Sequence, residues 1–147
     1  VQECLQALGI ETDHISIRTS YTGVSGYQEM VDNPTEVIRV HGTQYLLESL
    51  NQTDSLLIVD DVFSTGLNVD AVIRRLQGRL KRNMPKNIRV ASLWHKPKQN
   101  RTERVPDFYM HETDDWLVLP YELCGLSDEE LRDNKSFALP ILGSVES

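Results

Sequence analysis

The pattern of hydrophobic residues predicts strands that alternate with helices. Residues 55–59 form a continuous apolar run, which is typical of a strand buried on both faces of a parallel sheet. Residues 89–94 predict the next strand. This alternation predicts an α/β fold: a three-layer, mainly parallel sheet flanked by helices. Between the two strands, apolar residues recur at the spacing of a helix that buries one face, namely Val69, Val72, Ile73, Leu76 and Leu80.

Smaller elements surround this unit. Residues 14–19 alternate between apolar and polar side chains, as a strand does, and 37–40 predict another short strand. Between them, residues 20–36 contain Gly23, Gly26 and an Asp-Asn-Pro stop, so we expect a long loop that is either functional or disordered. We also expect a helix at the start of the chain, a short helix at 43–50, a polar loop at 95–106, a short strand at 107–110 and an apolar stretch at 116–119.

Length and composition narrow the class of protein. A chain of 147 residues predicts a single domain spanning 1–147. The net charge of −7 argues against general affinity for nucleic acid or for anionic membranes, and any anionic substrate needs local donors. Two cysteines without metal-ligand partners at useful spacing, no apolar run of membrane-spanning length and no secretory signal favour a reducing cytoplasm.

The turn after the first buried strand has the chemistry of a sugar-phosphate site. In open parallel sheets, ligands bind at the carboxyl ends of strands, where Asp60 and Asp61 are expected. Thr65, Gly66 and Asn68 then offer donors for a phosphate at the positive end of the next helix. The two carboxylates suit ribose hydroxyls or a Mg²⁺ ion with its water. The alternative is a solvated acidic turn that binds no ligand.

The segment 57–66 resembles the 5-phosphoribosyl-1-diphosphate (PRPP) motif of type I phosphoribosyltransferases: a hydrophobic strand, two acids, two variable residues, then a small residue with Thr-Gly. The resemblance covers nearly the whole chain and favours the xanthine-guanine and hypoxanthine-guanine branch. It implies PRPP and a purine base as partners, and Mg²⁺ as cofactor. It assigns catalytic positions to Asp60, Asp61 and Ser64, and the 5-phosphate to Ser64, Thr65, Gly66, Leu67 and Asn68.

The same resemblance assigns the loop and the base. Ser20 and Tyr21 open the loop 20–36, as in the mobile catalytic loop of those enzymes. Lys96 would face the purine 6-oxo group, where a cationic donor selects a carbonyl over an amine. The alternative is an exposed loop lysine. A basic cluster beside it, Lys98, Arg101 and Arg104, has no motif and is expected to be a solvated loop, although it would also suit diphosphate or a neighbouring subunit.

The region 107–147 would complete the base site. Trp116 corresponds to the aromatic residue that stacks on the purine, and the backbone of Leu117 would contact the base edge. The alternative for Trp116 is a core tryptophan. Glu122 would join Asp60 and Asp61 near magnesium. By the habit of the family, we expect a homodimer or homotetramer.

Two departures from the family pattern leave the function open. Where the purine branch usually has an Asp that acts as base, this chain has Ser64, whose hydroxyl cannot take up a proton near neutral pH. Family members also carry a strand and a diphosphate-binding loop before the helix that begins here at Val1, so we expect a further segment upstream. The main expectation is phosphoribosyl transfer to a 6-oxopurine (hypoxanthine, guanine or xanthine) with release of diphosphate. The alternatives are a non-catalytic sensor of PRPP or nucleotides, a transferase for a non-purine substrate, and a hydrolase or phosphorylase of the same fold.

Overall fold

The computed structural model describes residues 1–21, 38–123 and 126–142. They belong to two compact units, Val1–Asp114 and Asp115–Ser147, and the single domain expected from the length stays a prediction. The first unit contains α1 (Gln2–Ala7), β1 (Arg18–Tyr21), β2 (Ile38–His41), α4 (Gln44–Ser49), β3 (Ser55–Phe63), α5 (Leu67–Leu80), β4 (Asn87–His95) and β5 (Phe108–Glu112), with 3-10 turns at Lys81–Asn83 and Pro97–Gln99.

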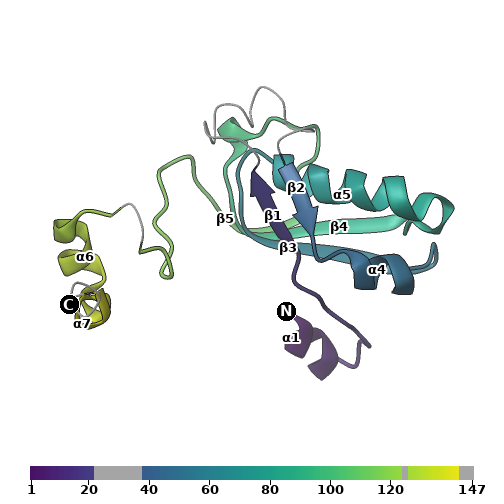
Figure 1. The fold of residues 1–147 in the computed structure, drawn as a ribbon, viewed down its shortest axis with the longest axis horizontal. Helices are drawn as coiled ribbons and strands as arrows, with labels where there is room; N and C mark the ends of the chain where they lie inside the picture. The colour runs from purple at the N-terminus through teal and green to yellow at the C-terminus, as the bar shows by residue number, and fades with distance from the viewer. Residues whose placement is uncertain (22–37, 124–125, 143–147) are drawn as a thin grey trace. The chain divides into compact units, whose positions relative to one another are not determined.

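A parallel sheet of three strands, in the order β3-β4-β5, forms the centre of the first unit (Figure 1). Its register pairs Ile58 with Val90 and Ala91 with Phe108. The predicted α/β class, a mainly parallel sheet flanked by helices, is confirmed. Strand β3 is longer than predicted, because the pairing with β4 continues to Phe63 opposite His95.

Helix α5 carries the core of the first unit. The predicted apolar face is buried: Val72, Leu76 and Leu80 pack with Leu46 of α4, whereas Val69 and Ile73 pack with Phe63 and Val90 of the sheet. The side chains of Leu56 and Ile58 in β3 join this packing. Val59 alternates with them on the opposite face of β3 and is exposed, so within the described residues this strand is not buried on both faces as predicted.

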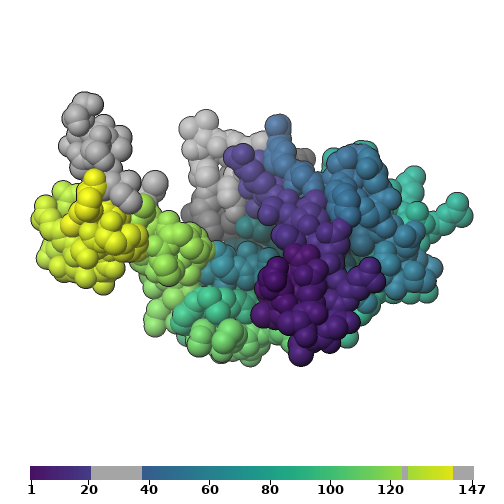
Figure 2. Space-filling view, turned by 90° about the horizontal axis from the view of Figure 1, so that it is seen from below, coloured from purple at the N-terminus to yellow at the C-terminus, as the bar shows by residue number. Residues whose placement is uncertain are grey.

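Strands β1 and β2 form a separate antiparallel pair, in which Tyr21 lies opposite Ile38. The strand predicted at 14–19 begins only at Arg18, although Ile15 and Ile17 still pack against the core. The predicted loop 20–36 lies outside the described residues except for its first two. Helix α1 has no buried residue, and Figure 2 shows its purple atoms at the surface.

The second unit contains α6 (Asp128–Asn134), a 3-10 turn at Ser136–Ala138 and α7 (Leu139–Leu142). Ser127 caps α6 by accepting a hydrogen bond from the backbone of Glu130, whose side chain reaches back to the Ser127 backbone. Lys135 is buried, and its ammonium group donates to the carbonyl oxygens of Leu119 and Glu122. None of the described helices is both long and apolar enough to cross a membrane.

Candidate phosphate-binding site

The turn between β3 and α5 consists of Ser64, Thr65 and Gly66. Gly66 is the N-cap of α5 and has a φ of 75°, a left-handed conformation that favours glycine. The Thr65 hydroxyl accepts a hydrogen bond from the Leu67 amide at 3.3 Å. The amides of a first helical turn have no carbonyl acceptor within the helix, and they carry the positive end of the helix dipole. The turn therefore has the donors and the field that an anion requires.

The loop that follows β4 lies directly on this turn. Lys96 donates its backbone N–H to the Phe63 carbonyl at 2.9 Å, and Arg101 donates its own to the Thr65 carbonyl at 2.9 Å. A Cβ atom placed on Gly66 would lie 2.5 Å from Thr102 Oγ1 and 3.1 Å from Asn100 Oδ1. The sequence gives no signal for this contact, because it arises from the parallel pairing of β3 with β4. The expectation of a simply solvated basic loop is therefore incomplete.

A small hollow lies at the turn and is lined by Asp60, residues 62–66, Asn68 and Val69. Its volume is about 10 Å³, which is room for one water molecule. Gly66 is tightly enclosed by the Asn100–Arg104 loop and by Phe63, whose Cζ would lie 2.9 Å from a Cβ atom placed on this glycine. A bound phosphate must therefore lie over the outer side of the turn, or the side chains of this loop must turn aside.

The two acids lie within β3 and not after it, because the strand runs on to Phe63. Successive side chains of a strand leave the backbone toward opposite faces, yet the two carboxyl groups remain close enough to interact with each other. Asp60 is partly buried and is the one of the two that lines the hollow, whereas Asp61 is exposed. Burial, and then the neighbouring Asp61 carboxylate, raises the pKa of Asp60 to about 6. Asp60 is thus poised to exchange a proton near neutral pH.

His95, at the end of β4, is a residue that sequence reasoning overlooked. It is buried at 5% exposure, and its ring lies 5.9 Å from the Phe63 ring and 5.1 Å from the Tyr109 ring, between centroids. Within the described residues, neither ring nitrogen has a hydrogen-bond partner. Such buried polar atoms are rare in proteins. The next residue, Lys96, is also 5% exposed, which excludes the exposed loop lysine.

Comparison with solved structures identifies the fold. Hypoxanthine phosphoribosyltransferase from Trypanosoma cruzi, in complex with the product IMP, has a TM-score of 0.55 and 18% identity, covering 79% of this chain and 54% of that one. A second structure of the Trypanosoma cruzi enzyme has a TM-score of 0.57 and 16% identity, covering 77% of this chain and 51% of that one. The hypoxanthine phosphoribosyltransferase from Staphylococcus aureus has a TM-score of 0.51 and 20% identity, covering 80% of this chain and 54% of that one. The chain has the type I phosphoribosyltransferase fold.

The chain spans about half the length of these phosphoribosyltransferases. No protein-family model matches it, and no curated protein sequence matches it. The likeness therefore rests on the arrangement of the strands and helices. It agrees with the resemblance of segment 57–66 to the PRPP motif of this fold.

The remaining predicted residues lie in different parts of this phosphoribosyltransferase fold. Ser20 belongs to β1, and its hydroxyl lies 2.9 Å from Nε2 of His41; Tyr21 ends the same strand. Trp116, Leu117 and Glu122 belong to the second unit. Trp116 is 87% exposed, and its stacking role stays a prediction. The Glu122 carboxylate accepts a hydrogen bond from the Leu119 amide at 2.8 Å, which gives it a structural role within its own turn.

The described residues contain no group of three or more His, Cys, Asp or Glu side chains able to hold a metal ion. Asp60 and Asp61 are adjacent in sequence, and each offers one carboxylate. Mg²⁺ is usually held by one or two carboxylates together with substrate phosphates and water. The donors present therefore suit a Mg²⁺ ion that arrives with a diphosphate substrate, and they do not suit a resident ion held by the protein alone.

Proposed function

We propose that this chain is the PRPP-binding part of a phosphoribosyltransferase that joins phosphoribose to a 6-oxopurine base. The observation that carries the proposal is the position of Asp60 beside the turn 64–66 at the start of α5. Acceptors for a sugar next to donors for a phosphate suit a phosphorylated sugar. A perturbed carboxylate at such a place is typical of a functional site.

In the proposed reaction, the bond between the anomeric carbon of PRPP and its diphosphate breaks, and a bond from that carbon to a ring nitrogen of the base forms. Ser64, Thr65, Gly66, Leu67 and Asn68 hold the 5-phosphate, and this remote binding energy positions the ribose. Asp60 and Asp61 accept hydrogen bonds from the ribose hydroxyls. Mg²⁺ bound with the substrate supplies charge neutralisation for the departing diphosphate.

The base would be held by Lys96, Trp116 and Leu117. Lys96 donates to the 6-oxo group, Trp116 stacks on the ring, and the backbone of Leu117 contacts the base edge. The proton of the base goes to solvent or to another group, because the Ser64 hydroxyl is not basic enough to receive it near neutral pH. We therefore expect slower turnover than in a relative with Asp at this position.

An assay of the protein with PRPP, Mg²⁺ and a panel of bases tests this proposal. We expect nucleotide and diphosphate from hypoxanthine, guanine or xanthine, and none from adenine or orotate. Asp60→Asn combined with Asp61→Asn should lower kcat/KM by about 100-fold or more, since both ribose contacts are weakened. Asp133→Asn, which alters an exposed carboxylate of α6, is the control and should leave the rate unchanged. Equal rates for the double variant and the control would remove the two acids from the site.

A second candidate function is a PRPP or nucleotide sensor without catalysis. Two observations favour it: Ser64 stands where a proton acceptor is usual, and the Asn100–Arg104 loop encloses Gly66. Calorimetry with PRPP and Mg²⁺, followed by analysis of the same samples for nucleotide, separates the two functions. Saturable binding without product from any base would favour the sensor, whereas product formation excludes it.

We also propose that the chain assembles as a homodimer or homotetramer. The support is the resemblance to a family of oligomeric enzymes, and one of the similar structures concerns the oligomeric state and activity of the Trypanosoma cruzi enzyme. Sedimentation velocity over a range of concentrations measures the state directly. A monomer at the highest concentration would contradict the proposal.

A further inference from the structure

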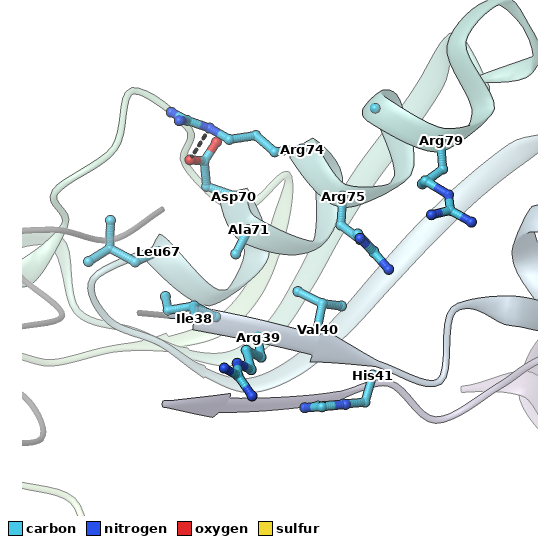
Figure 3. A pocket seen from close by; sticks show the side chains of 11 residues that line it. Ile38, Arg39, Val40, His41, Leu67, Asp70, Ala71, Arg74, Arg75 and Arg79 are labelled. Carbon is cyan, nitrogen blue, oxygen red and sulfur yellow. Dashed lines mark ion pairs between the residues drawn. The ribbon is translucent and has the colours of Figure 1, made fainter. Parts of the chain in front are cut away.

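A groove of about 690 Å³ runs between β2 and one face of α5 (Figure 3). Its volume is within the range of small-molecule binding sites, about 300–1,000 Å³. It shares no lining residue with the hollow at the phosphate turn. The groove is therefore a second concave region of the first unit. Of the residues proposed to hold the 5-phosphate, Leu67 also lines it.

One part of the groove is apolar. Ile38 of β2 and Leu67 of α5 are buried at 7% and 5% exposure, and Ala71 packs against them. Val40 also lines the groove, and Figure 3 shows Ile38 and Val40 on the side of β2 toward α5. Because Ile38 and Leu67 are already buried in this cluster, the apolar surface left for a ligand comes from the partly buried Ala71 and Val40.

The other part of the groove is cationic. Arg75 and Arg79 lie one helical turn apart on α5, and Figure 3 shows both extending toward the side where β2 lies. Arg39 of β2 is a lining residue too, but Figure 3 shows its side chain on the side of β2 away from α5. Among the described residues, none of these three arginines has a carboxylate within ion-pair distance. In a chain with a net charge of −7, this is an unusual local concentration of unneutralised positive charge.

Arg74, the neighbour of Arg75, is different. Its Nε atom lies 2.8 Å from the Asp70 carboxylate, and Figure 3 shows the two side chains against each other. Asp70 is the one acid among the described residues that line the groove, and this ion pair neutralises it. Within that part of the chain, an anion in the groove would thus face the guanidinium groups of Arg75 and Arg79 without a competing carboxylate.

We propose that this groove binds a nucleoside polyphosphate, with its phosphates on Arg75 and Arg79 and its nucleoside against the apolar wall. A guanidinium group can hold a phosphate through two parallel hydrogen bonds, so two arginines one turn apart suit two successive phosphates. The nucleoside accounts for the apolar wall, which inorganic diphosphate would leave unused. The proposal stands whether or not the chain transfers phosphoribose.

Calorimetric titration of the whole chain with ADP tests the proposal. Diphosphate and adenosine are titrated in parallel. We expect saturable binding of ADP, binding of diphosphate weaker by about tenfold or more, and none of adenosine. The ADP affinity should fall as the ionic strength rises, because the interaction is ionic and partly exposed. Equal affinity for ADP and diphosphate would overturn the role of the nucleoside, and binding of adenosine would overturn the role of the phosphates.

Variants locate the site. Arg75→Gln combined with Arg79→Gln should weaken ADP binding by about tenfold or more, since two charged hydrogen-bond donors are lost. Arg74→Gln is the matched control on the same helix and should change the affinity by less than about twofold, because Arg74 is already paired. Thr65→Val should also leave ADP binding unchanged. A loss with Thr65→Val would move the binding to the phosphate turn, and equal losses with Arg74→Gln would indicate a diffuse charge effect; either result overturns the proposal.

A neutral substitution provides an independent test. Gly78 lines the groove, and a Cβ atom on it would meet no other atom within 4 Å. Gly78→Leu therefore fills the groove without a change of charge, and it replaces a poor helix former with a good one. We expect a folded protein with the unaltered circular dichroism spectrum and ADP binding weakened by about tenfold or more. Full ADP affinity in folded Gly78→Leu would overturn the proposal.

Discussion

Helix α5 borders two concave regions that differ in the source of their positive character. At its N-terminal end, the turn 64–66 offers backbone amides and hydroxyls. Among the described residues that line the hollow there, Asp60 is the charged one, and it is an acid. Along its face, the groove offers the guanidinium groups of Arg75 and Arg79 beside an apolar wall. The first region suits a phosphate joined to a sugar whose hydroxyls need acceptors. The second suits phosphates joined to a group that avoids water.

The difference also lies in how each region is assembled. The phosphate turn is made by one continuous segment, so its shape depends on local backbone geometry and on Gly66. The groove combines α5 with β2, which lies about thirty residues earlier in the chain. A change to the backbone should therefore damage the first region most, whereas a change of charge should affect mainly the second.

The largest expected effect is that of Gly66→Ala. The backbone of Gly66 has a φ of 75°, and a Cβ atom on this residue would lie 2.5 Å from Thr102 Oγ1. Backbone strain and overpacking together should lower the free energy of unfolding by about 2–4 kcal/mol. Urea denaturation measures this value.

Gly78→Ala is the matched control on the same helix. Its Cβ meets no atom within 4 Å, and Ala favours the helix, so stability should rise by about 0.5–1 kcal/mol. Equal effects of the two substitutions would show that the phosphate turn is not backbone-constrained.

The second effect concerns the pH dependence of the ligand-free protein. The pKa of Asp60 rises from 3.8 to about 6 on folding, so the folded state holds this proton more tightly than the unfolded chain. The contribution of Asp60 to stability is complete below the unfolded pKa, and it is lost as the pH rises through the folded pKa. Above about pH 6, the charged and partly buried carboxylate costs roughly 2–3 kcal/mol.

Asp60→Asn removes this cost. The variant should be more stable than the wild type at about pH 7.5, and the difference should vanish near pH 4. Asp61→Asn should recover part of the same gain, because the Asp61 charge contributes to the shift. Urea denaturation at both pH values provides the measurement. A difference that does not change with pH would contradict the perturbed pKa of Asp60.

An intermediate effect is expected where the loop after β4 meets the turn. The Asn100 side chain donates to the Arg104 carbonyl at 2.9 Å and accepts from the Thr102 amide at 2.9 Å. Asn100→Ala should lower the free energy of unfolding by about 1–2 kcal/mol. Arg101→Ala is the control, because its contact with Thr65 is made by the backbone and survives the change. If both variants were equally stable, the Asn100 side chain would not hold the loop.

The smallest effect concerns the groove. Arg75 and Arg79 repel each other at a spacing of four residues, so Arg75→Gln should raise stability by about 0.2–0.5 kcal/mol in the absence of ligand. Arg74→Gln breaks the ion pair with Asp70 and should lower stability by a similar amount. Thermal melts at low salt measure both changes, and high salt should abolish them. A loss of stability with Arg75→Gln would indicate that this arginine already has a partner in the protein.

The sequence predicts the first region far better than the second. The apolar run 55–59, the two acids and the Thr-Gly pair are contiguous, and a contiguous pattern determines a strand, a turn and a helix start. The length of β3 was predicted wrongly, because pairing of Asp60 with Ser92 and of Phe63 with His95 depends on the neighbouring strand. Asp60 and Asp61 therefore lie within β3 and not after its end.

Contacts between segments account for what the sequence did not predict. The position of Arg101 on Thr65 and the burial of His95 between Phe63 and Tyr109 both follow from the parallel register of β3, β4 and β5. The groove forms only where the face of α5 that carries Arg75 and Arg79 lies beside β2. Its arginines appear in the sequence as ordinary charged residues of a helix surface, and no motif distinguishes them.

The buried Lys135 has a practical consequence for handling this protein. Its ammonium group ties residues after α6 to the Leu119–Glu122 turn, so the order of that turn depends on atoms contributed from near the C-terminus. Shortening the chain before Lys135, or acetylating its amine, would leave two carbonyl groups without their donor. Helix α1 has no buried residue, so substitutions there should disturb the packing of the described residues less.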